Sequence, residues 1–288
     1  MIPRSPEAII QAAIMDADRN DLFVEGIHDK MVLEFLSEPN RNHAIRIFPI
    51  DEIAEIGESE NGAKGRLLKL AHFASRESAT NLKFFVDRDL DCFVGDDLPN
   101  NTWKTDFPDL EGYLINDKTV SKILKLCYNT ERLDASVFLA SLMSICRKTG
   151  LLRVFSRRKK LDLPITKTNK TKCITLKSGI ITFDFDRFFT AVLQGAGQKL
   201  SKKTTLLRGF DALKKELADE PSENLVRGKD FIEISIIALR RYGIESKEFE
   251  QILWGTLESS IIPNYPALDC VVKFLSRTIE PENSHVPV

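Results

Sequence analysis

Short apolar runs alternate with amphipathic segments of helical length over the first 120 residues. Residues 28–36 and 67–74 place their apolar side chains mostly on one side, as amphipathic helices do. The runs with the length and residue types of strands are 21–25, 44–50, 82–86 and 103–106. Because strands separated by such helices form βαβ units, the pattern predicts an α/β fold with a mostly parallel, Rossmann-like sheet flanked by helices.

The pattern changes after residue 120, where helical periodicity dominates. A short helical segment begins over 110–115, and the later helices are predicted at 120–149, 185–193, 206–217, 231–242 and 249–257. Residues 173–176 and 180–183 flank Lys177-Ser178-Gly179 and predict a β-hairpin. We therefore expect an α/β domain over 1–118 and a mainly helical region, carrying the hairpin, over 119–288.

Composition favours a globular protein of the reducing cytosol. The 288 residues are 43% hydrophobic and 29% charged, with a formal net charge of −1. That balance argues neither for nor against a nucleic-acid partner. The five cysteines are scattered and lack zinc-site spacing, which fits reduced thiols. The N-terminus resembles no signal peptide, and the apolar runs are shorter than the roughly 20 residues of a membrane helix, so we expect a cytoplasmic protein without a membrane partner.

Acidic residues stand where two predicted strands end. Glu25 ends the first strand, Asp87 follows the third, and Asp89 and Asp91 come shortly after. In a parallel α/β sheet the carboxyl ends of the strands form the ligand-binding edge, so these carboxylates should meet there. A divalent cation would relieve their mutual repulsion, and oxygen-only ligands favour Mg²⁺ or Mn²⁺. The sequence therefore predicts a metal centre suited to phosphate chemistry.

Each acidic residue also has a structural interpretation. Glu25 could be a solvated residue at a strand end, and Asp87 to Asp91 could form an acid-rich turn. Asp29 is better interpreted as the N-cap of the helix that follows it. Asp184-Phe185-Asp186 repeats the spelling of the acidic motif but lies between a hairpin strand and a helix, where capping is the better explanation.

Three segments within the first 115 residues resemble Toprim domains. LFVEGIHDKMVLEFL resembles the Toprim glutamate motif, and FFVDRDLD resembles its DxD partner. TDFPDLEGYLI, with the later VRGKDFIEI, resembles a bacterial Toprim-like family encoded beside ABC-type or SMC-like ATPases. That family is related to the overcoming-lysogenization-defect (OLD) nucleases and includes the effectors of PARIS anti-phage systems. The resemblance implies that residues 1–118 form a Toprim-like catalytic domain.

The resemblance also implies roles for individual acids. Glu25 would be the catalytic acid that binds metal or moves a proton, and Asp87 and Asp89 would hold Mg²⁺. Asp91 is a possible further ligand. Glu111 would offer a carboxylate to a second metal ion, although an exposed acid in the first turn of a helix is an equal alternative.

The family further implies a toxic effector nuclease that a partner ATPase holds inactive until phage infection. Transfer RNA is the substrate class that the PARIS branch suggests. Because a nuclease that cuts both sides of a stem commonly works as a dimer, we also expect a homodimer in the active state. Two alternatives stay open: an OLD-like DNA endonuclease, and a catalytically silent Toprim-fold regulatory subunit of an ATPase complex.

Residues 147–172 carry ten Lys or Arg against a single acid, a net charge of +9. Such a segment could bind a phosphate backbone, or it could be a solvated loop or a contact with an acidic partner. The candidate nucleic-acid contacts are Arg153, Arg157, Arg158, Lys159, Lys160, Lys170 and Lys172. Lys64, in a glycine-rich turn, and Lys229 could each touch phosphate, although a solvated or structural lysine is the simpler interpretation of both.

Overall fold

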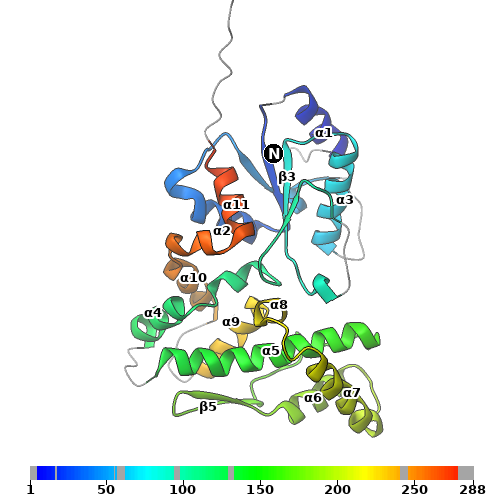
Figure 1. Cartoon of the computed structure of the whole chain (residues 1–288), viewed down its shortest axis with the longest axis vertical. Coiled ribbons are helices and arrows are strands. Elements are labelled where there is room, and N and C mark those ends of the chain that lie inside the picture. The colour runs from blue at the N-terminus through cyan, green and yellow to red at the C-terminus, as the bar shows by residue number, and fades with distance from the viewer. Residues whose placement is uncertain are drawn as a thin grey trace, which may run out of the picture. The chain divides into compact units, whose positions relative to one another are not determined.

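The computed structural model describes residues 5–16, 18–54, 56, 62–93, 98–128, 133–240 and 246–277 (Figure 1). The chain divides into two compact units. We name them the sheet unit, which comprises Met1–Asp87, Asp96–Asp106 and Ser259–Val288, and the helical unit, which comprises Arg88–Gly95 and Phe107–Glu258. This division differs from the predicted boundary at residue 118 in two ways. The last helix joins the sheet unit, and residues 107–118 join the helical unit.

The described residues of the sheet unit form four parallel strands in the order β2-β1-β3-β4. Their bounds are β1 Asp21–Val24, β2 Arg46–Pro49, β3 Leu82–Val86 and β4 Thr102–Lys104. All four residues of β1 are buried, which suits a central strand covered on both faces. The prediction of an α/β fold with a parallel sheet in its first part is confirmed.

The α-helices in the described part of this unit are α1 Pro6–Met15, α2 Ile27–Ser37, α3 Gly62–Arg76 and α11 Pro266–Leu275. Helices α1 and α3 lie on one side of the strands, and α2 and α11 lie on the other (Figure 1). On the α1 and α3 side, the ring of Phe23 stacks on Phe48 and Phe84, with centroid distances of 5.5 and 5.3 Å. Burial of these rings fixes the register of β1 between its neighbours.

Helix α11 joins the sheet unit through contacts across more than 160 residues of sequence. The carboxylate of Asp106 accepts hydrogen bonds from the backbone N–H groups of Ala267 and Leu268, at 3.1 and 3.2 Å. The rings of Trp103 and Phe274 meet edge to face at a centroid distance of 5.6 Å. These contacts satisfy the first turn of α11 and bury its apolar side, so they explain why the helix leaves the predicted helical region.

The helical unit is organised around α5 Ala135–Lys159. The other helices are α4 Asp117–Tyr128, α6 Phe185–Gly195, α7 Lys203–Glu216, α8 Ser222–Leu225, α9 Gly228–Leu239 and α10 Ser246–Thr256. The predicted hairpin is present as antiparallel β5 Ile174–Lys177 and β6 Ile180–Phe183. A hydrophobic core of the helical unit includes aromatic side chains of α5, α6 and α7, among them Phe155, Phe188, Phe189 and Phe210.

Short 3-10 helices complete the described chain. They are η1 Glu38–Asn40, η2 Ile50–Glu52, η3 Asp91–Phe93, η4 Leu110–Leu114, η5 Leu200–Lys202 and η7 Ser259–Asn264. The segment predicted to begin a helix at 110–115 is therefore a 3-10 turn.

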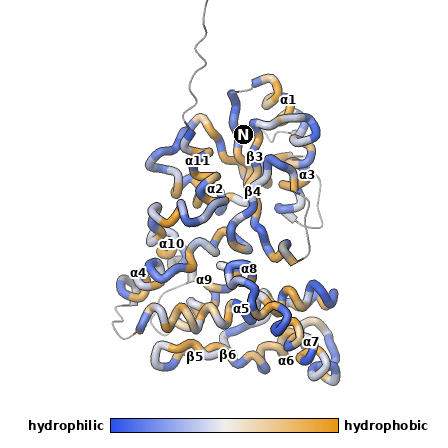
Figure 2. The backbone as a smooth tube through the Cα atoms, in the orientation of Figure 1, coloured by the Kyte–Doolittle hydropathy of each residue, from blue (hydrophilic) through white to orange (hydrophobic). Residues whose placement is uncertain are grey.

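Helix α5 is the one described helix that is long and apolar enough to cross a membrane by length and composition. It is also the central helix of the helical unit, and its buried face includes Leu142, Leu151 and Leu152. Hydrophilic and hydrophobic residues are interleaved along it (Figure 2). These features are those of a core helix of a globular protein, and the cytoplasmic location stays a prediction.

Candidate active site

Glu25 and Asp87 lie together at the carboxyl ends of β1 and β3. The two strands are neighbours, with Asp21 opposite Leu82 and Phe23 opposite Phe84, so the same register brings position 25 level with the end of β3. The Oε1 atom of Glu25 accepts a hydrogen bond from the backbone N–H of Asp87 at 2.8 Å. Both residues are half-buried. The structure therefore brings the Glu25 carboxylate to the backbone of Asp87, a residue 62 positions away in the chain.

Helix α2 begins immediately after Glu25. Gly26 is its N-cap residue, and the Gly26 N–H donates to the carboxylate of Asp29 at 2.9 Å. Asp29 is therefore the third helical residue of a capping box, and its prediction as the N-cap was wrong by three positions. Glu25 and Gly26 alone therefore link β1 to α2, and the Gly26–Asp29 hydrogen bond closes this short turn.

Asp89 and Asp91 belong to the helical unit. Asp89 has a left-handed backbone with φ of 52°, and its N–H donates to the carbonyl of Pro108 at 2.7 Å. Asp91 begins η3, is buried, and has its Oδ1 3.8 Å from Nη1 of Arg157. The turn after β3 is therefore held by specific contacts, and metal binding by Asp89 and Asp91 stays a prediction.

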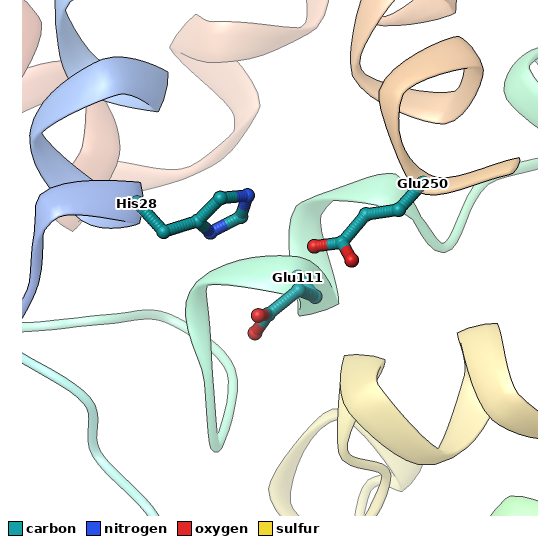
Figure 3. A group of neighbouring side chains, drawn as sticks. All are labelled: His28, Glu111 and Glu250. Atoms are coloured by element: carbon teal, nitrogen blue, oxygen red, sulfur yellow. The ribbon is translucent and has the colours of Figure 1, made fainter. Parts of the chain in front are cut away.

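Glu111 lies in η4 and is buried, so its interpretation as an exposed acid was wrong. Its Oε1 is 3.7 Å from Nζ of Lys229, and its Oε2 is buried without a hydrogen-bond partner among the described residues. Carboxylate oxygens of Glu111 and Glu250 come within 4.8 Å of each other (Figure 3). Burial, followed by the negative charge of Asp109, raises the pKa of Glu111 to about 7.

Asp109 is a buried acid that the sequence did not single out. Its carboxylate accepts hydrogen bonds from the N–H groups of Gly228 at 2.6 Å and Lys229 at 3.2 Å, and Nε of Arg227 is 3.5 Å away. Burial raises the pKa of Asp109, while the charges of Arg227 and Lys229 oppose the rise. The residue caps α9 from 119 positions away, so sequence spacing alone carries no signal for the contact.

Gly228 shows how closely these two segments pack. A Cβ atom at this position would lie 2.1 Å from the carbonyl carbon of Glu111. Only glycine lets the start of α9 approach the backbone of η4 so closely. The two segments that resemble the family's later elements, around residues 111 and 228, therefore form one packed structure inside the helical unit.

Two of the predicted nucleic-acid contacts are structural ion pairs instead. Arg153 is buried and binds Asp230 with both guanidinium Nη atoms, and its pair holds the pKa of Asp230 below the ordinary value. Lys170 has a fully buried side chain, and its Nζ is 2.7 Å from Oε2 of Glu233. We correct the expectation for both residues, because a buried cation with a carboxylate partner is not available to a phosphate backbone.

The other candidate cations of this segment are exposed. Arg157, Arg158, Lys159 and Lys160 follow one another at the end of α5, and Lys172 precedes the hairpin. Arg158 pairs with Glu216 at 2.7 Å, an exposed contact that costs little to exchange. Lys64 lies half-buried in the first turn of α3, and the side chain of Lys229 is half exposed at the start of α9.

No protein-family model matches this chain, and a search of curated proteins finds no match to it. The family resemblance therefore rests on the motifs at residues 22–36, 84–91 and 105–115 and on the later VRGKDFIEI. What the structure adds is the shared position of Glu25 and Asp87 at one edge of a parallel sheet.

Proposed function

We propose that the chain is a Mg²⁺-dependent endonuclease of the Toprim type, with Glu25 and Asp87 at its catalytic centre. The observation that supports the proposal is the hydrogen bond between Glu25 Oε1 and the backbone N–H of Asp87, two residues that follow adjacent parallel strands. This edge is where parallel α/β sheets bind their ligands. The sequence reaches the same pair through motifs of known nucleases.

The donor atoms suit the metal. Glu25, Asp87 and Asp89 offer only carboxylate oxygens, which Mg²⁺ and Mn²⁺ prefer, and the two that belong to the sheet unit are half-buried. A bound divalent ion would polarise the scissile phosphate and steady the leaving oxygen. In this proposal Asp87 and Asp89 would hold the ion, and Glu25, which accepts the Asp87 N–H, would help to bind the ion or to move a proton.

RNA, and transfer RNA in particular, is the substrate class that we propose. The support is the resemblance to the PARIS branch, together with the row of exposed cations at residues 157–160. The same resemblance supports a toxic role in anti-phage defence, an ABC-type or SMC-like ATPase as the controlling partner, and a homodimer as the active form. A cationic surface would contribute a salt-dependent affinity for the phosphate backbone.

The test is to map RNA ends and chromosome breaks in cells that express the chain from its natural gene neighbourhood, under phage challenge. We expect new RNA ends with the wild type and none with Glu25→Gln. The matched control is Glu7→Gln, an exposed glutamate of α1 in the same unit, which should cut like the wild type.

Equal cleavage by the wild type and Glu25→Gln would overturn the nuclease assignment. Intact RNA with broken chromosomes would replace RNA by DNA as the substrate and would favour the OLD-like alternative. Growth arrest without any cleavage in either polymer would favour the regulatory subunit.

A further inference from the structure

The helical unit contains an open pocket of about 630 Å³ that is lined by one face of α9, loop 166–171, Glu111 and Glu250. Its volume lies within the range of small-molecule sites, roughly 300–1,000 Å³. The α9 residues that face it are Lys229, Ile232, Glu233, Ile236 and Ile237. Their spacing of three and four residues places them in one stripe along the helix.

Glu111 gives this pocket a buried hydrogen-bond acceptor. The residue is 5% exposed, and its Oε2 has no hydrogen-bond partner among the described residues. The other oxygen, Oε1, faces the ammonium of Lys229 at 3.7 Å, beyond hydrogen-bond length. A buried acceptor without a donor destabilises the fold, so a ligand with N–H groups would gain binding energy here.

The remaining lining distinguishes the kind of ligand. Ile236 and Ile237 are half-buried, so they present aliphatic surface on which a flat ring can pack. Lys167, which is exposed on the opposing loop, supplies positive charge for an anionic group. The charge of Lys229 faces Glu111, and the acids Glu233 and Glu250 favour the N–H donors of a ligand. The lining therefore matches a planar base with adjacent N–H donors that is attached to a phosphate.

We propose that this pocket binds a guanine nucleotide, with the N1–H and N2–H groups of the base donating to the carboxylate of Glu111. Guanine is the nucleobase that presents two adjacent N–H donors, which match the two oxygens of a carboxylate. The phosphate lies toward Lys167, at the other end of the nucleotide from Glu111. A second divalent cation fits this position less well, because the ammonium of Lys229 already lies 3.7 Å from Glu111.

A free guanine nucleotide and a guanosine within an RNA strand share this chemistry. The experiment measures binding to the full chain by calorimetry in EDTA, with GMP, AMP and a guanosine-containing RNA tetranucleotide. We expect GMP to bind at least roughly ten-fold more tightly than AMP, and Glu111→Gln to weaken GMP by roughly ten-fold or more. The matched control is Asp211→Asn, which removes an exposed carboxylate of α7 in the same unit and should leave GMP binding unchanged.

Two further comparisons sharpen the test. Lys167→Ala should weaken the binding of GMP more than the binding of guanosine, because it removes a charge that only the phosphate contacts. If Glu111→Gln fails to fold, Ile236→Glu replaces it in the experiment. This change is at a half-buried wall position and should reduce GMP binding. Tighter binding of the tetranucleotide than of GMP, with the same dependence on Glu111, would assign the pocket to the RNA strand. Tighter binding of GMP would assign it to the free nucleotide.

Undetectable GMP binding, equal binding of AMP, or a folded Glu111→Gln chain that binds GMP like the wild type would each overturn the proposal. The proposal does not depend on the centre at Glu25 and Asp87. Glu25→Gln and Asp87→Asn should bind GMP like the wild type, so failure of the pocket and failure of the nuclease are separate outcomes.

Discussion

The carboxylate of Glu25 accepts a hydrogen bond from the backbone N–H of Asp87, with 2.8 Å between Oε1 and N. The bond joins the residue after β1 to the residue after β3, two strands that are adjacent in the sheet. It satisfies the first amide beyond the β3 ladder and holds the start of the acidic turn in place. Stability and the proposed chemistry therefore depend on the same glutamate in different ways.

Substitutions of Glu25 should separate these two effects. In Glu25→Gln the amide oxygen can still accept the Asp87 N–H, so the free energy of unfolding should change by less than about 1 kcal/mol while cleavage falls by roughly 100-fold or more. Glu25→Ala leaves that N–H without its acceptor and should cost about 1–2 kcal/mol as well. Urea unfolding of both variants measures the difference. Equal loss of stability in the two would contradict the proposed bonding role.

Arg153 should matter for stability and not for nucleic-acid binding. Arg153→Met leaves the buried carboxylate of Asp230 without its cation, and we expect a loss of about 3–5 kcal/mol in the free energy of unfolding. Arg158→Met breaks only an exposed pair with Glu216 and should cost less than about 1 kcal/mol. Chemical denaturation compares them. A small loss of unfolding free energy in Arg153→Met, together with weakened RNA binding, would instead support a nucleic-acid contact at this residue.

The exposed cations at the end of α5 should contribute to RNA affinity. Lys159→Ala with Lys160→Ala removes two exposed charges without a buried contact. We expect weaker RNA binding and a decrease of roughly 1–2 in the slope of log affinity against log salt concentration. Fluorescence anisotropy at several salt concentrations measures this slope. An unchanged slope would place the RNA-binding surface elsewhere.

Two glycines of the helical unit should respond oppositely to alanine. Gly228→Ala places a Cβ 2.1 Å from the backbone of Glu111 and should cost about 3 kcal/mol, the upper end of typical overpacking. At Gly255 in α10 a Cβ would meet nothing within 4 Å, so Gly255→Ala should be neutral or stabilise by up to about 1 kcal/mol. Thermal melts of both variants report the contrast. A tolerated alanine at 228 would refute the close approach of α9 to η4.

Glu111 should make stability depend on pH. Its pKa rises from the ordinary 4.5 to about 7 because of burial and the charges of Asp109 and Glu250, which Lys229 partly offsets. The folded state therefore binds this proton more tightly than the unfolded state, and the stability that the proton contributes is complete below pH 4.5 and is lost as pH rises to about 7. A pKa elevation of this size corresponds to a change of roughly 3 kcal/mol in the free energy of unfolding.

The measurement is the difference in unfolding free energy between Glu111→Gln and the wild type at pH 5 and pH 8. We expect the difference to move in favour of the variant as pH rises, because glutamine does not ionise. A difference that stays constant between the two pH values would show that Glu111 has an ordinary pKa.

The strands of the sheet unit are largely predictable from sequence. Apolar runs such as Leu82–Val86 are short, bounded by polar residues and separated by helical periodicity, so their type and their end at Asp87 follow from local pattern. Because parallel strands end at one edge, the proximity of Glu25 to Asp87 also follows. The pattern cannot predict that a glutamate oxygen meets a backbone N–H there, since this depends on side-chain geometry.

Contacts between distant segments are what the sequence leaves open. The docking of α11 depends on Asp106 and Trp103, more than 160 residues earlier, and the burial of Asp109 depends on α9. The basic segment is misleading for a similar reason. Its charges fall partly on the buried side of α5 and of the following loop, and Arg153 and Lys170 acquire acidic partners from α9 that no local pattern reveals.

Mn²⁺ binding to the purified chain, followed by electron paramagnetic resonance, tests whether a divalent ion binds beside Glu25 and Asp87. We predict saturable binding by the wild type that is lost or weakened at least roughly ten-fold in Asp87→Asn and in Glu25→Gln. Glu7→Gln should bind Mn²⁺ like the wild type. Unchanged Mn²⁺ binding in both Asp87→Asn and Glu25→Gln would contradict the account.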